Sequence, residues 1–519
     1  MDAFRRFLLS PITLLNINNS KVKGGKQIKL KIFETRSVKI LNSPNCFYTE
    51  LRKQVKSAKR HVSLASLYLG ISDKEIVLRD DLCKLIESNK NIQMRILVDK
   101  NRGTRPDRET GASTASLCTT LLHAARNNQA TNCNKGNNDT NVNINFFEMP
   151  RSPDASKLRI FVESFLPPRF NEMFQTFHMK AYVFDDTVIL SGANLSTDYF
   201  TNRQDRYIVI DCPQLASFYH KMIEILGKYS YSLTLPLVDQ DDAGKEKQDD
   251  KNKISFALVD NMKKNEKNTI NLKRELEDLI YVQEIDDLRN YENATTICAP
   301  TIQFKSIGID HDEQVTCSFL SNVPTNKDRL NVASGYLNFT DTYTNLMATS
   351  GASIHAMTAS PKANGFYTAN GVSGSLPLAY SLLEQQFIET FNKTRTDTKI
   401  NMHEYGREGW TFHGKGMWFI PGGNVNEKQS IKAPTGTIIG SPNYGWRSVL
   451  RDSESQIYLH TYDHELQQDL YDEWNLMEKD ANIVHEDIFK EPGRFTREFF
   501  NWKEGHWINI GARLVKTFM

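Results

Sequence analysis

The sequence is poor in cysteine, and it has no cysteine pair spaced for metal binding. Seven cysteines are dispersed along 519 residues without a Cys-x-x-Cys pair, at Cys46, Cys83, Cys118, Cys133, Cys212, Cys298 and Cys317. An odd, scattered set indicates reduced thiols in a reducing compartment and argues against a zinc site. No acidic cluster suited to holding a metal is found either, so we predict no metal and no cofactor.

The chain also lacks long apolar runs and an excess of one charge. Nowhere do about 18 apolar residues follow one another, so no spanning helix is predicted and any membrane contact would be peripheral. The 64 basic and 62 acidic residues leave a net charge of +2. Dedicated nucleic-acid binders usually carry a clear basic excess, so no nucleic-acid partner is expected. Apolar residues make up 39% of the chain, which predicts that most of it folds.

Acidic residues are scarce at the N-terminus. After Asp2 none appears before Glu34, whereas Arg5, Arg6 and several lysines accumulate among apolar residues. A basic, amphipathic and acid-poor segment is typical of a mitochondrial presequence. We therefore predict that residues 1–36 are a presequence or a disordered N-terminus. The alternative is a frayed basic N-terminus without a targeting role.

The segment around which the chain is organised is 177–185, Phe-His-Met-Lys-Ala-Tyr-Val-Phe-Asp. It is typical of a strand, and alternation along a strand places His178 and Lys180 on the same face. An ammonium supplies charge and donors to a phosphate, and an imidazole can attack phosphorus or move a proton. A single His-x-Lys on a strand is more often an ordinary solvated surface.

A second copy of the motif supports a functional role for the first. His413 and Lys415 lie 235 residues downstream of His178 and Lys180. A turn of small residues ending in Asn follows each copy, Ser-Gly-Ala-Asn at 191–194 and Gly-Ser-Pro-Asn at 440–443. Eleven residues after each Asn comes a carboxylate, at Asp205 and Glu454. This spacing indicates a duplicated domain and not a short-period repeat.

Each copy lies within a similar succession of predicted elements. Strands at 61–69 and 94–99 flank a helix near 74–89, which is the pattern of a βαβ unit. Apolar segments at 331–337 and 354–360 occupy the corresponding places in the second half. We predict an α/β fold with a first half at 37–236, a charged linker at 237–268, and a second half with C-terminal helices at 269–519.

Two such halves would bring both histidines to one cleft. Two lysines and two asparagines, Lys180, Lys415, Asn194 and Asn443, would surround a phosphate with donors and stabilise a pentacoordinate transition state. One imidazole would form a phosphohistidine and the other would act as general acid and base. Asp205 and Glu454 sit where each can accept a hydrogen bond from the far nitrogen of a histidine and fix its tautomer.

These residues resemble the phospholipase D superfamily, whose signature is a duplicated His-x-Lys-x4-Asp with Gly-Ser-x-Asn. The resemblance covers most of residues 38–460. The first copy includes Asp185, whereas Ile420 stands at the corresponding position of the second. The resemblance implies two pseudo-twofold-related α/β/α sandwich halves with mixed, mostly parallel sheets and one shared active site. It adds Asp185 to the catalytic set and Ser441 to the phosphate-binding set, although that Asp usually supports the fold around the site.

Segments 191–207, 359–367 and 409–416 resemble the eukaryotic mitochondrial phosphatidylglycerophosphate synthases more specifically. That resemblance implies a reaction of CDP-diacylglycerol with sn-glycerol 3-phosphate to phosphatidylglycerophosphate and CMP, towards cardiolipin. It implies peripheral contact with the matrix side of the mitochondrial inner membrane. His178 would be the nucleophile and His413 the general acid and base, with the reverse assignment left open.

A second phosphate on the acceptor calls for further polar residues near the cleft. Those expected to bind substrate are Arg102, Arg105, Arg203, Arg206, Lys362 and Asn364. The loop of Arg102 and Arg105 leaves the end of a predicted strand, where ligands bind in open α/β sheets, although a solvated basic loop explains it equally well.

Three rival functions stay open. The first is another transferase or hydrolase of the superfamily: a cardiolipin synthase, a phosphatidylserine synthase or a phospholipase D. The second is a nuclease-type phosphodiesterase. The third is a catalytically silent lipid-binding scaffold. The identity of the acceptor separates the first group from the predicted reaction.

Overall fold

The computed structural model describes most of the chain. The described residues are 2–10, 12–13, 27–130, 141–150, 175–235, 256–260, 266–281, 291–368, 374, 376–395, 400–422 and 433–490. Most of the predicted linker, 237–268, and the chain after residue 490 lie outside them. No helix within the described ranges is both long and apolar enough to cross a bilayer.

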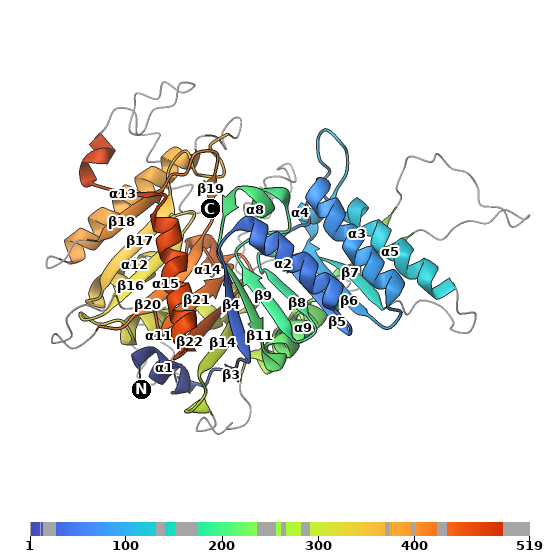
Figure 1. Ribbon diagram of the computed structural model, residues 1–519, viewed down its shortest axis with the longest axis horizontal. Coiled ribbons are helices and arrows are strands. Elements are labelled where there is room, and N and C mark those ends of the chain that lie inside the picture. Colours follow the sequence, from blue (N-terminus) through green and yellow to red (C-terminus); the bar gives the residue numbers. More distant parts are fainter. Residues whose placement is uncertain are drawn as a thin grey trace, which may run out of the picture.

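Two large mixed sheets form the centre of the molecule (Figure 1). In pairing order, the first contains β13 (Ala257–Asp260), β12 (Tyr231–Thr234), β7 (Val142–Phe147), β6 (Gln93–Asp99), β5 (His61–Ser66), β8 (Ala181–Phe184), β9 (Thr187–Ser191), β11 (Tyr207–Asp211) and β4 (Ser37–Leu41). The second contains β15 (Ile309–Asp310), β14 (Thr296–Phe304), β22 (Glu454–Thr461), β21 (Gly436–Gly440), β20 (Lys415–Ile420), β16 (Arg329–Ser334), β17 (Ser353–Ala359), β18 (Asn401–Tyr405) and β23 (Ala481–Ile483), with β3 (Phe33–Glu34) paired to β14.

The predicted α/β class with mixed sheets is confirmed, but the expectation of mostly parallel strands is wrong. Among the described strands, the parallel pairs of the large sheets are β5–β6, β6–β7, β16–β17 and β17–β18. The other pairs in both sheets are antiparallel. The reason is local: only Asp185 and Asp186 separate β8 from β9, and so short a connection makes a hairpin, whereas a parallel pair needs a long crossover.

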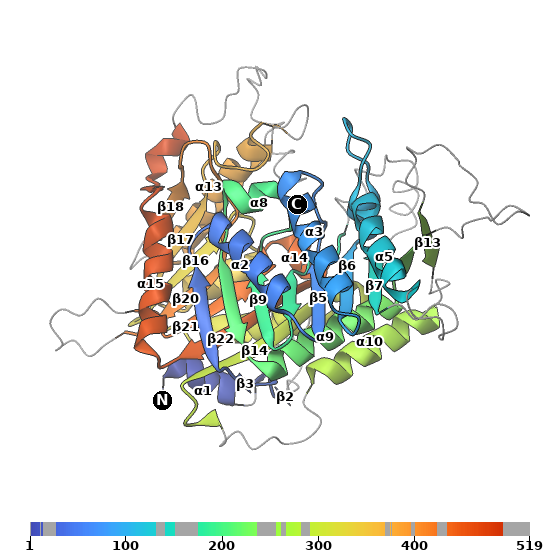
Figure 2. The ribbon, with the colours of Figure 1, turned by 45° about the vertical axis from the view of Figure 1, so that its right-hand side comes forward.

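Helices cover the outer face of each sheet. On the first sheet these are α2 (Pro44–Ser57), α3 (Asp73–Ser88) and α5 (Thr114–Ala130), which share one apolar cluster with its strands. On the second they are α11 (His311–Asn322), α12 (Asp341–Thr349) and α13 (Leu376–Thr394). Figure 1 shows the two groups toward opposite sides of the molecule, and Figure 2 shows α2, α3 and α5 in front of the first sheet. The α2 sequence explains its position, because Ser43 caps its first turn and Phe47, Leu51 and Val55 recur at helical spacing on its buried face.

The largest apolar cluster lies where the two sheets face each other. It unites residues of both sheets with α9 (Pro213–Lys228), α10 (Glu266–Ile280) and α15 (His464–Glu478). α15 packs against β4 of the first sheet and against β18 and β22 of the second. Side chains such as Met222 and Trp418, both fully buried, belong to this shared cluster. The halves are therefore joined by a continuous core, which fixes the position of one half relative to the other.

The N-terminal segment differs from its prediction. Asp2 caps the short helix α1 (Ala3–Leu9), which lies beside β22 (Figure 1). Phe4 of this helix is fully buried in the core of the second sheet. The Arg5 guanidinium is also buried and donates to the carbonyl oxygen of Ala294 at 2.6 Å. The mixture of arginine and apolar residues that is typical of a presequence equally suits a helix that packs into a core. Residues 2–10 are thus part of the fold, and the prediction of disorder is wrong for them.

The predicted linker also contributes structure. β13, at 257–260, lies inside the range predicted as linker, yet it pairs with β12 at the edge of the first sheet. α10, assigned by prediction to the second half, packs on α9 of the first. The short apolar run Ala257-Leu258-Val259 within a charged segment was the available signal for this strand.

Candidate active site

Each His-x-Lys segment is held by backbone bonds to the opposite half. His178 lies just before β8, and its N–H donates to the carbonyl oxygen of Ser453 at 3.1 Å. His413 follows β19 (Thr411–Phe412), which pairs in parallel with β10 (Arg203–Gln204) of the first half. The His413 N–H donates to the carbonyl oxygen of Gln204 at 2.7 Å. In both cases the accepting residue comes immediately before the carboxylate of the opposite half: Ser453 precedes Glu454, and Gln204 precedes Asp205.

Each half supplies the carboxylate that bonds to the histidine of the other half. Both oxygens of Glu454, from the second half, lie 2.9 Å from Nδ1 of His178 in the first. Asp205, from the first half, places Oδ2 at 2.6 Å from Nδ1 of His413 in the second. A carboxylate that accepts from Nδ1–H leaves the lone pair on Nε2, which is the tautomer that can attack phosphorus or take a proton.

Burial keeps both imidazoles neutral. It lowers the pKa of His178 well below its ordinary value, and the charge of Lys180 lowers it further. The pKa of His413 is also well below its ordinary value, first through burial and then through Lys415. A desolvated imidazole beside an ammonium disfavours a second positive charge. Both side chains are therefore in the neutral form that nucleophilic attack needs.

The same burial perturbs the lysines and carboxylates. It lowers the pKa of Lys180 to about 7 and that of Lys415 to about 8. It raises the pKa of Asp205 to about 6 and that of Glu454 to about 7. Four groups thus titrate near neutrality in one small volume, and a bound phosphate would favour the charged form of each lysine.

The space around Lys415 depends on Gly192. A Cβ at Gly192 would lie 2.6 Å from Nζ of Lys415 and 2.9 Å from Oδ2 of Asp205. Those distances are below van der Waals contact. A side chain at position 192 would therefore displace Lys415, and glycine lets this turn of the first half lie against the Lys415 of the second half. The Ser-Gly order in the first copy, which departs from Gly-Ser-x-Asn, thus places a glycine at the point of closest approach.

The two histidines have different neighbours at Nε2. Tyr199, on α8 (Thr197–Thr201), places its hydroxyl 3.3 Å from Nε2 of His413. Nζ of Lys415 lies 2.7 Å from Nδ1 and 3.2 Å from Nε2 of the same ring. An ionised carboxylate can only accept, so we assign the Nδ1 proton to the bond with Asp205. Nε2 of His178, by contrast, has no hydrogen-bond partner among the described residues.

Tyr199 is a site residue that the sequence reasoning missed. It lies five residues after Asn194, and the matching position after Asn443 is Ser448. Ser448 uses its hydroxyl to accept from the backbone N–H of Asn443 at 3.0 Å. The duplicated motif is therefore unequal at this position, and a comparison of the two copies at that offset would have revealed it.

The guanidinium groups of Arg203 and Arg102 each lie over a tyrosine ring. The Arg203 guanidinium lies 4.8 Å from the ring centre of Tyr199 and pairs with Asp198 at 3.3 Å. Its charge contributes to the low pKa of His413, so it lies close to the reacting groups. Arg102 lies 4.3 Å from the ring centre of Tyr68. Tyr336, a further residue that the prediction omitted, stands edge-on to His413 with ring centres 5.7 Å apart.

The two asparagines have unused polar atoms, whereas Ser441 is engaged. Oδ1 of Asn194 and Oδ1 of Asn443 are buried without a hydrogen-bond partner within the described chain. The amide of Asn194 makes one long contact, from Nδ2 to the hydroxyl of Tyr199 at 3.5 Å. The Ser441 hydroxyl accepts from the N–H of Ser455 at 3.1 Å and donates to its carbonyl at 3.3 Å. Ser441 thus holds two strands together, and the Nδ2 groups of the two asparagines are the better donors for a phosphate.

Of the four other predicted substrate contacts, Arg206 and Asn364 are engaged within the fold. Arg206 is 1% exposed and pairs with Glu473 inside the core, so it cannot reach a substrate. Asn364 is buried and its side chain accepts from the N–H of Phe366 at 3.0 Å, which closes a turn. Lys362 is exposed at the start of that turn after β17. Arg105 follows α4 (Lys100–Thr104) and is partly buried, and its contact with substrate stays a prediction.

Asp185 does not share the cleft with the other catalytic candidates. It lies at the far end of β8 from His178, and its carboxylate accepts from three backbone N–H groups, those of Lys59, Arg60 and His61, at 2.8 to 2.9 Å. Although burial opposes it, these bonds hold the pKa of Asp185 below its ordinary value. Its assignment to the catalytic set is therefore corrected, because it anchors the start of β5 and not a phosphate.

Substitution Asp185→Asn tests that structural role. Asn tolerates the φ of 51° at this position, but its single carbonyl oxygen cannot serve three donors. We expect the free energy of unfolding to fall by about 1–3 kcal/mol while the folded enzyme keeps its kcat. Urea unfolding and turnover measured on the same preparation check this. A large loss of kcat with unchanged stability would contradict it.

A buried ion pair supports the His178 side of the site. Asp452 accepts from Nε of Arg447 at 2.7 Å and from the N–H of Thr176 at 2.7 Å. His178, Asp452 and Glu454 each offer an atom within 4.8 Å of the others and so form a group that can be tested for metal binding. Its oxygens already accept hydrogen bonds, however: Glu454 orients the imidazole, and Asp452 bonds to Arg447 and Thr176.

Comparisons with known proteins agree with this geometry. Residues 51–226 match the family model described as "Cardiolipin synthase, PLD-like domain". The chain is 32% identical over 504 residues to the mitochondrial CDP-diacylglycerol–glycerol-3-phosphate 3-phosphatidyltransferase of Gallus gallus, covering 93% of this chain and 83% of that one. It is 31% identical to the enzyme of the same name, without the mitochondrial label, from Saccharomyces pastorianus, covering 89% and 86%.

A solved structure shares the fold. The phosphatidylserine synthase of Haemophilus influenzae superimposes with a TM-score of 0.66, covering 94% of this chain and 97% of that one at 18% sequence identity. At that identity the likeness concerns the fold alone. It confirms the predicted phospholipase D-like α/β architecture.

Proposed function

The chain belongs to the family of CDP-diacylglycerol–glycerol-3-phosphate 3-phosphatidyltransferases, and from that premise we propose how its site performs the reaction. The phosphatidyl group of CDP-diacylglycerol passes to sn-glycerol 3-phosphate, and the products are phosphatidylglycerophosphate and CMP. The observation that carries the proposal is the pair of neutral imidazoles, each oriented by a carboxylate of the opposite half at 2.6 to 2.9 Å. Such a pair suits a double displacement at phosphorus.

In the first step His178 attacks. Its Nε2 forms a bond to the phosphorus that bears diacylglycerol, and the bond from that phosphorus to the CMP oxygen breaks. Glu454 accepts from Nδ1–H and stabilises the positive charge that develops on the ring. The bound diphosphate raises the pKa of His413, so its Nε2 takes up a proton from water when the substrate binds and then donates that proton to the departing CMP oxygen.

In the second step the acceptor takes the place of CMP. His413, now neutral, removes the proton from a hydroxyl of sn-glycerol 3-phosphate, and that oxygen attacks phosphorus. The bond between phosphorus and Nε2 of His178 breaks, which restores the free imidazole. One group thus acts as acid and then as base, as microscopic reversibility requires of a symmetrical double displacement.

The assignment of His178 as nucleophile rests on the different neighbours of the two rings. A nucleophile needs an unoccupied lone pair on Nε2, and that atom of His178 has no partner among the described residues. Nε2 of His413 is already close to the Tyr199 hydroxyl and to Lys415. A ring held between a hydroxyl and an ammonium is better placed to move protons than to bond with phosphorus.

Charge at the transition state is stabilised by fixed donors. Lys180 and Lys415 are each 1% exposed, so their ammonium groups act in a site from which water is largely excluded. The Nδ2 groups of Asn194 and Asn443 add neutral donors, and that of Asn194 makes only one long contact, to the Tyr199 hydroxyl at 3.5 Å. Arg203, at the His413 side, is the cation best placed for the phosphate of the acceptor.

The site of action follows from the lipid substrate and from the relatives. Several relatives are named mitochondrial. We propose that this chain acts at the matrix side of the mitochondrial inner membrane through peripheral contact, with the diacylglycerol tails in the bilayer and the diphosphate in the cleft. Fractionation with salt and carbonate washes tests the peripheral attachment.

A direct assay tests the reaction. Purified protein in detergent receives CDP-diacylglycerol with sn-glycerol 3-phosphate, with serine, with phosphatidylglycerol or with water alone, and no divalent metal is added. CMP release together with phosphatidylglycerophosphate only in the first mixture supports the proposal. Another lipid product assigns the chain to a different acceptor, as in a cardiolipin synthase, a phosphatidylserine synthase or a phospholipase D.

The pKa values predict a narrow pH profile. As the pH falls through about 7 and then about 6, Glu454 and then Asp205 take up protons and no longer orient the imidazoles. As the pH rises through about 7 and then about 8, Lys180 and then Lys415 lose the charge that binds phosphate. We therefore expect a bell-shaped dependence of kcat/KM for CDP-diacylglycerol on pH, with its maximum near pH 7. Because the groups interact, the apparent pKa of each limb belongs to the coupled set and not to one residue. A profile that stays flat from about pH 6 to about pH 9 would contradict this.

A further inference from the structure

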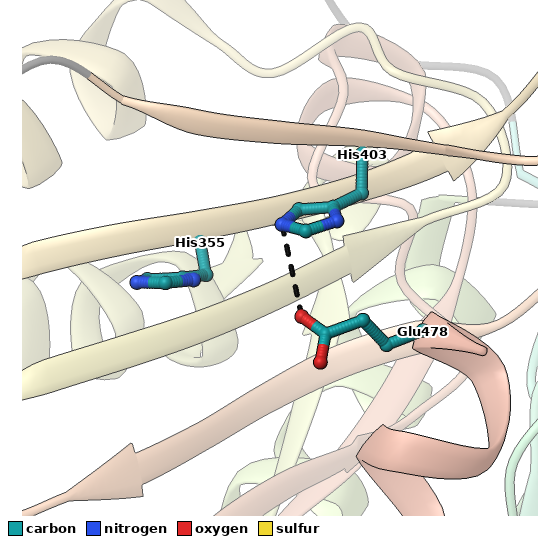
Figure 3. A group of neighbouring side chains, drawn as sticks. All are labelled: His355, His403 and Glu478. Carbon is teal, nitrogen blue, oxygen red and sulfur yellow. Dashed lines mark ion pairs between the residues drawn. The ribbon is translucent and has the colours of Figure 1, made fainter. Parts of the chain in front are cut away.

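We propose that His355, His403 and Glu478 form a binding site for a divalent transition-metal ion of the zinc type (Figure 3). The three side chains come from β17, from β18 and from the last residue of α15. They are separate from the histidine pair of the phosphotransfer site. The inference does not depend on the proposed reaction.

The sheet register brings the two histidines to one face. β17 and β18 are parallel, with His355 opposite Asn401 and Met357 opposite His403. Opposed residues of neighbouring strands point the same way, and so do residues two apart along one strand. His355 and His403 therefore lie on the sheet face against which α15 packs, and the C-terminal end of that helix supplies Glu478.

The spacing of the three groups suits a shared ion. One ligand atom from each lies within 4.8 Å of the other two. Nε2 of His403 lies 3.7 Å from Oε1 of Glu478, which is too far for a hydrogen bond. Two donors bound to one zinc at about 2.0–2.2 Å in tetrahedral geometry stand about 3.3–3.6 Å apart, so only a small adjustment would close the site.

A buried, unpartnered nitrogen is the second observation that indicates a ligand. Nδ1 of His355 is buried and has no hydrogen-bond partner among the described residues. In Figure 3 it is the ring nitrogen turned toward His403 and Glu478. Nε2 of the same ring lies 3.1 Å from Nδ2 of Asn401. Exchange of the Asn401 amide oxygen and nitrogen would let Oδ1 accept from Nε2–H, the outer bond that usually orients a metal-binding histidine.

A positively charged side chain lies near the three groups. Arg329 is the cation that faces the group, and its charge opposes an ion. Its Nε donates to Asn331 at 2.6 Å, and Glu478 offsets its charge.

The donor set limits the kind of ion. Two imidazoles and one carboxylate favour zinc and its transition-metal neighbours, whereas magnesium and calcium prefer oxygen ligands alone. Three protein ligands leave a fourth position for water. An ion here would tie the end of α15 to β17 and β18. The same helix carries Glu473, which pairs with Arg206 beside Asp205 of the active site.

Metal binding by the full-length protein tests the proposal. Metal-free protein is titrated with zinc, and with cobalt for its visible spectrum, and the bound metal per chain is measured after gel filtration. The variants are His355→Gln, His403→Gln and Glu478→Gln. The controls are His464→Gln, an exposed histidine on the same helix, and Glu454→Gln in the active-site group.

We expect one zinc per chain in the unsubstituted protein and in both controls, and loss of that zinc in the three variants. Zinc should also raise the melting temperature of the unsubstituted protein but not that of Glu478→Gln, a substitution at a half-exposed surface residue that leaves the core intact. Retention of zinc in Glu478→Gln and His355→Gln, loss of zinc in Glu454→Gln, or no uptake at micromolar zinc would each overturn the proposal.

Discussion

Asparagine in place of His178 is expected to lower kcat by about 10⁴-fold or more, because it removes the atom that bonds to phosphorus. The side chain can still fill the space beside Glu454, and the fold should persist. CMP release from CDP-diacylglycerol measures the loss. The variant should also fail to retain labelled phosphatidyl group after quenching in base, under which a phosphohistidine survives.

The matched change His413→Asn separates the two roles. It should slow turnover strongly, yet the protein should still become labelled, because His178 and its partner Glu454 remain. His464→Asn, at an exposed position, serves as the unaffected control. Label that persists in His178→Asn but disappears in His413→Asn would reverse the assignment. Label in neither variant, with full turnover in both, would remove the histidines from the reaction.

The sequence predicted the composition of this site well, because repetition marks it. His178, Lys180 and their copies recur with the same spacing, and alternation along a strand puts each pair on one face. The offset of eleven residues also drew attention to Asp205 and Glu454. It did not reveal that each carboxylate serves the histidine of the opposite half. That exchange depends on how the two halves pack against each other. The spacing of residues within one half does not determine this packing.

The predictions that were wrong assigned roles to charged residues without knowing whether their side chains are buried. Arg206 and Arg203 lie three residues apart and look alike in sequence, yet one is enclosed by the core and the other lies beside His413. The carboxylate of Asp185 belongs to the motif but binds backbone at the far end of its strand. Arg5 lies in a segment for which disorder was one prediction and is fully buried, while the targeting role of that segment stays a prediction. In each case the partner is distant in sequence, so only the folded chain identifies it.

Methionine in place of Arg206 is expected to cost about 3–5 kcal/mol of unfolding free energy, the largest effect on stability that we anticipate. The guanidinium lies 2.8 Å from Glu473, donates to Thr437 and Ile438, and rests 3.6 Å from the ring centre of Trp418. Removing it leaves the buried Glu473 carboxylate with the indole N–H of Trp418 as its remaining donor among the described residues. Denaturant unfolding measures the change.

A double substitution shows why the pair is present. Arg206→Met with Glu473→Leu removes both charges, and an apolar pair of similar volume should recover most of the lost stability, because neither charge is then left unpaired. Activity provides the second measurement. Arg206 follows Asp205 in the segment between β10 and β11, and it bonds to α15 and β21 of the other half. If the ion pair serves docking, the double variant should be stable but should lose kcat, since the Asp205–His413 geometry depends on how the halves meet. A double variant with both stability and kcat intact would show that apolar packing alone positions the site.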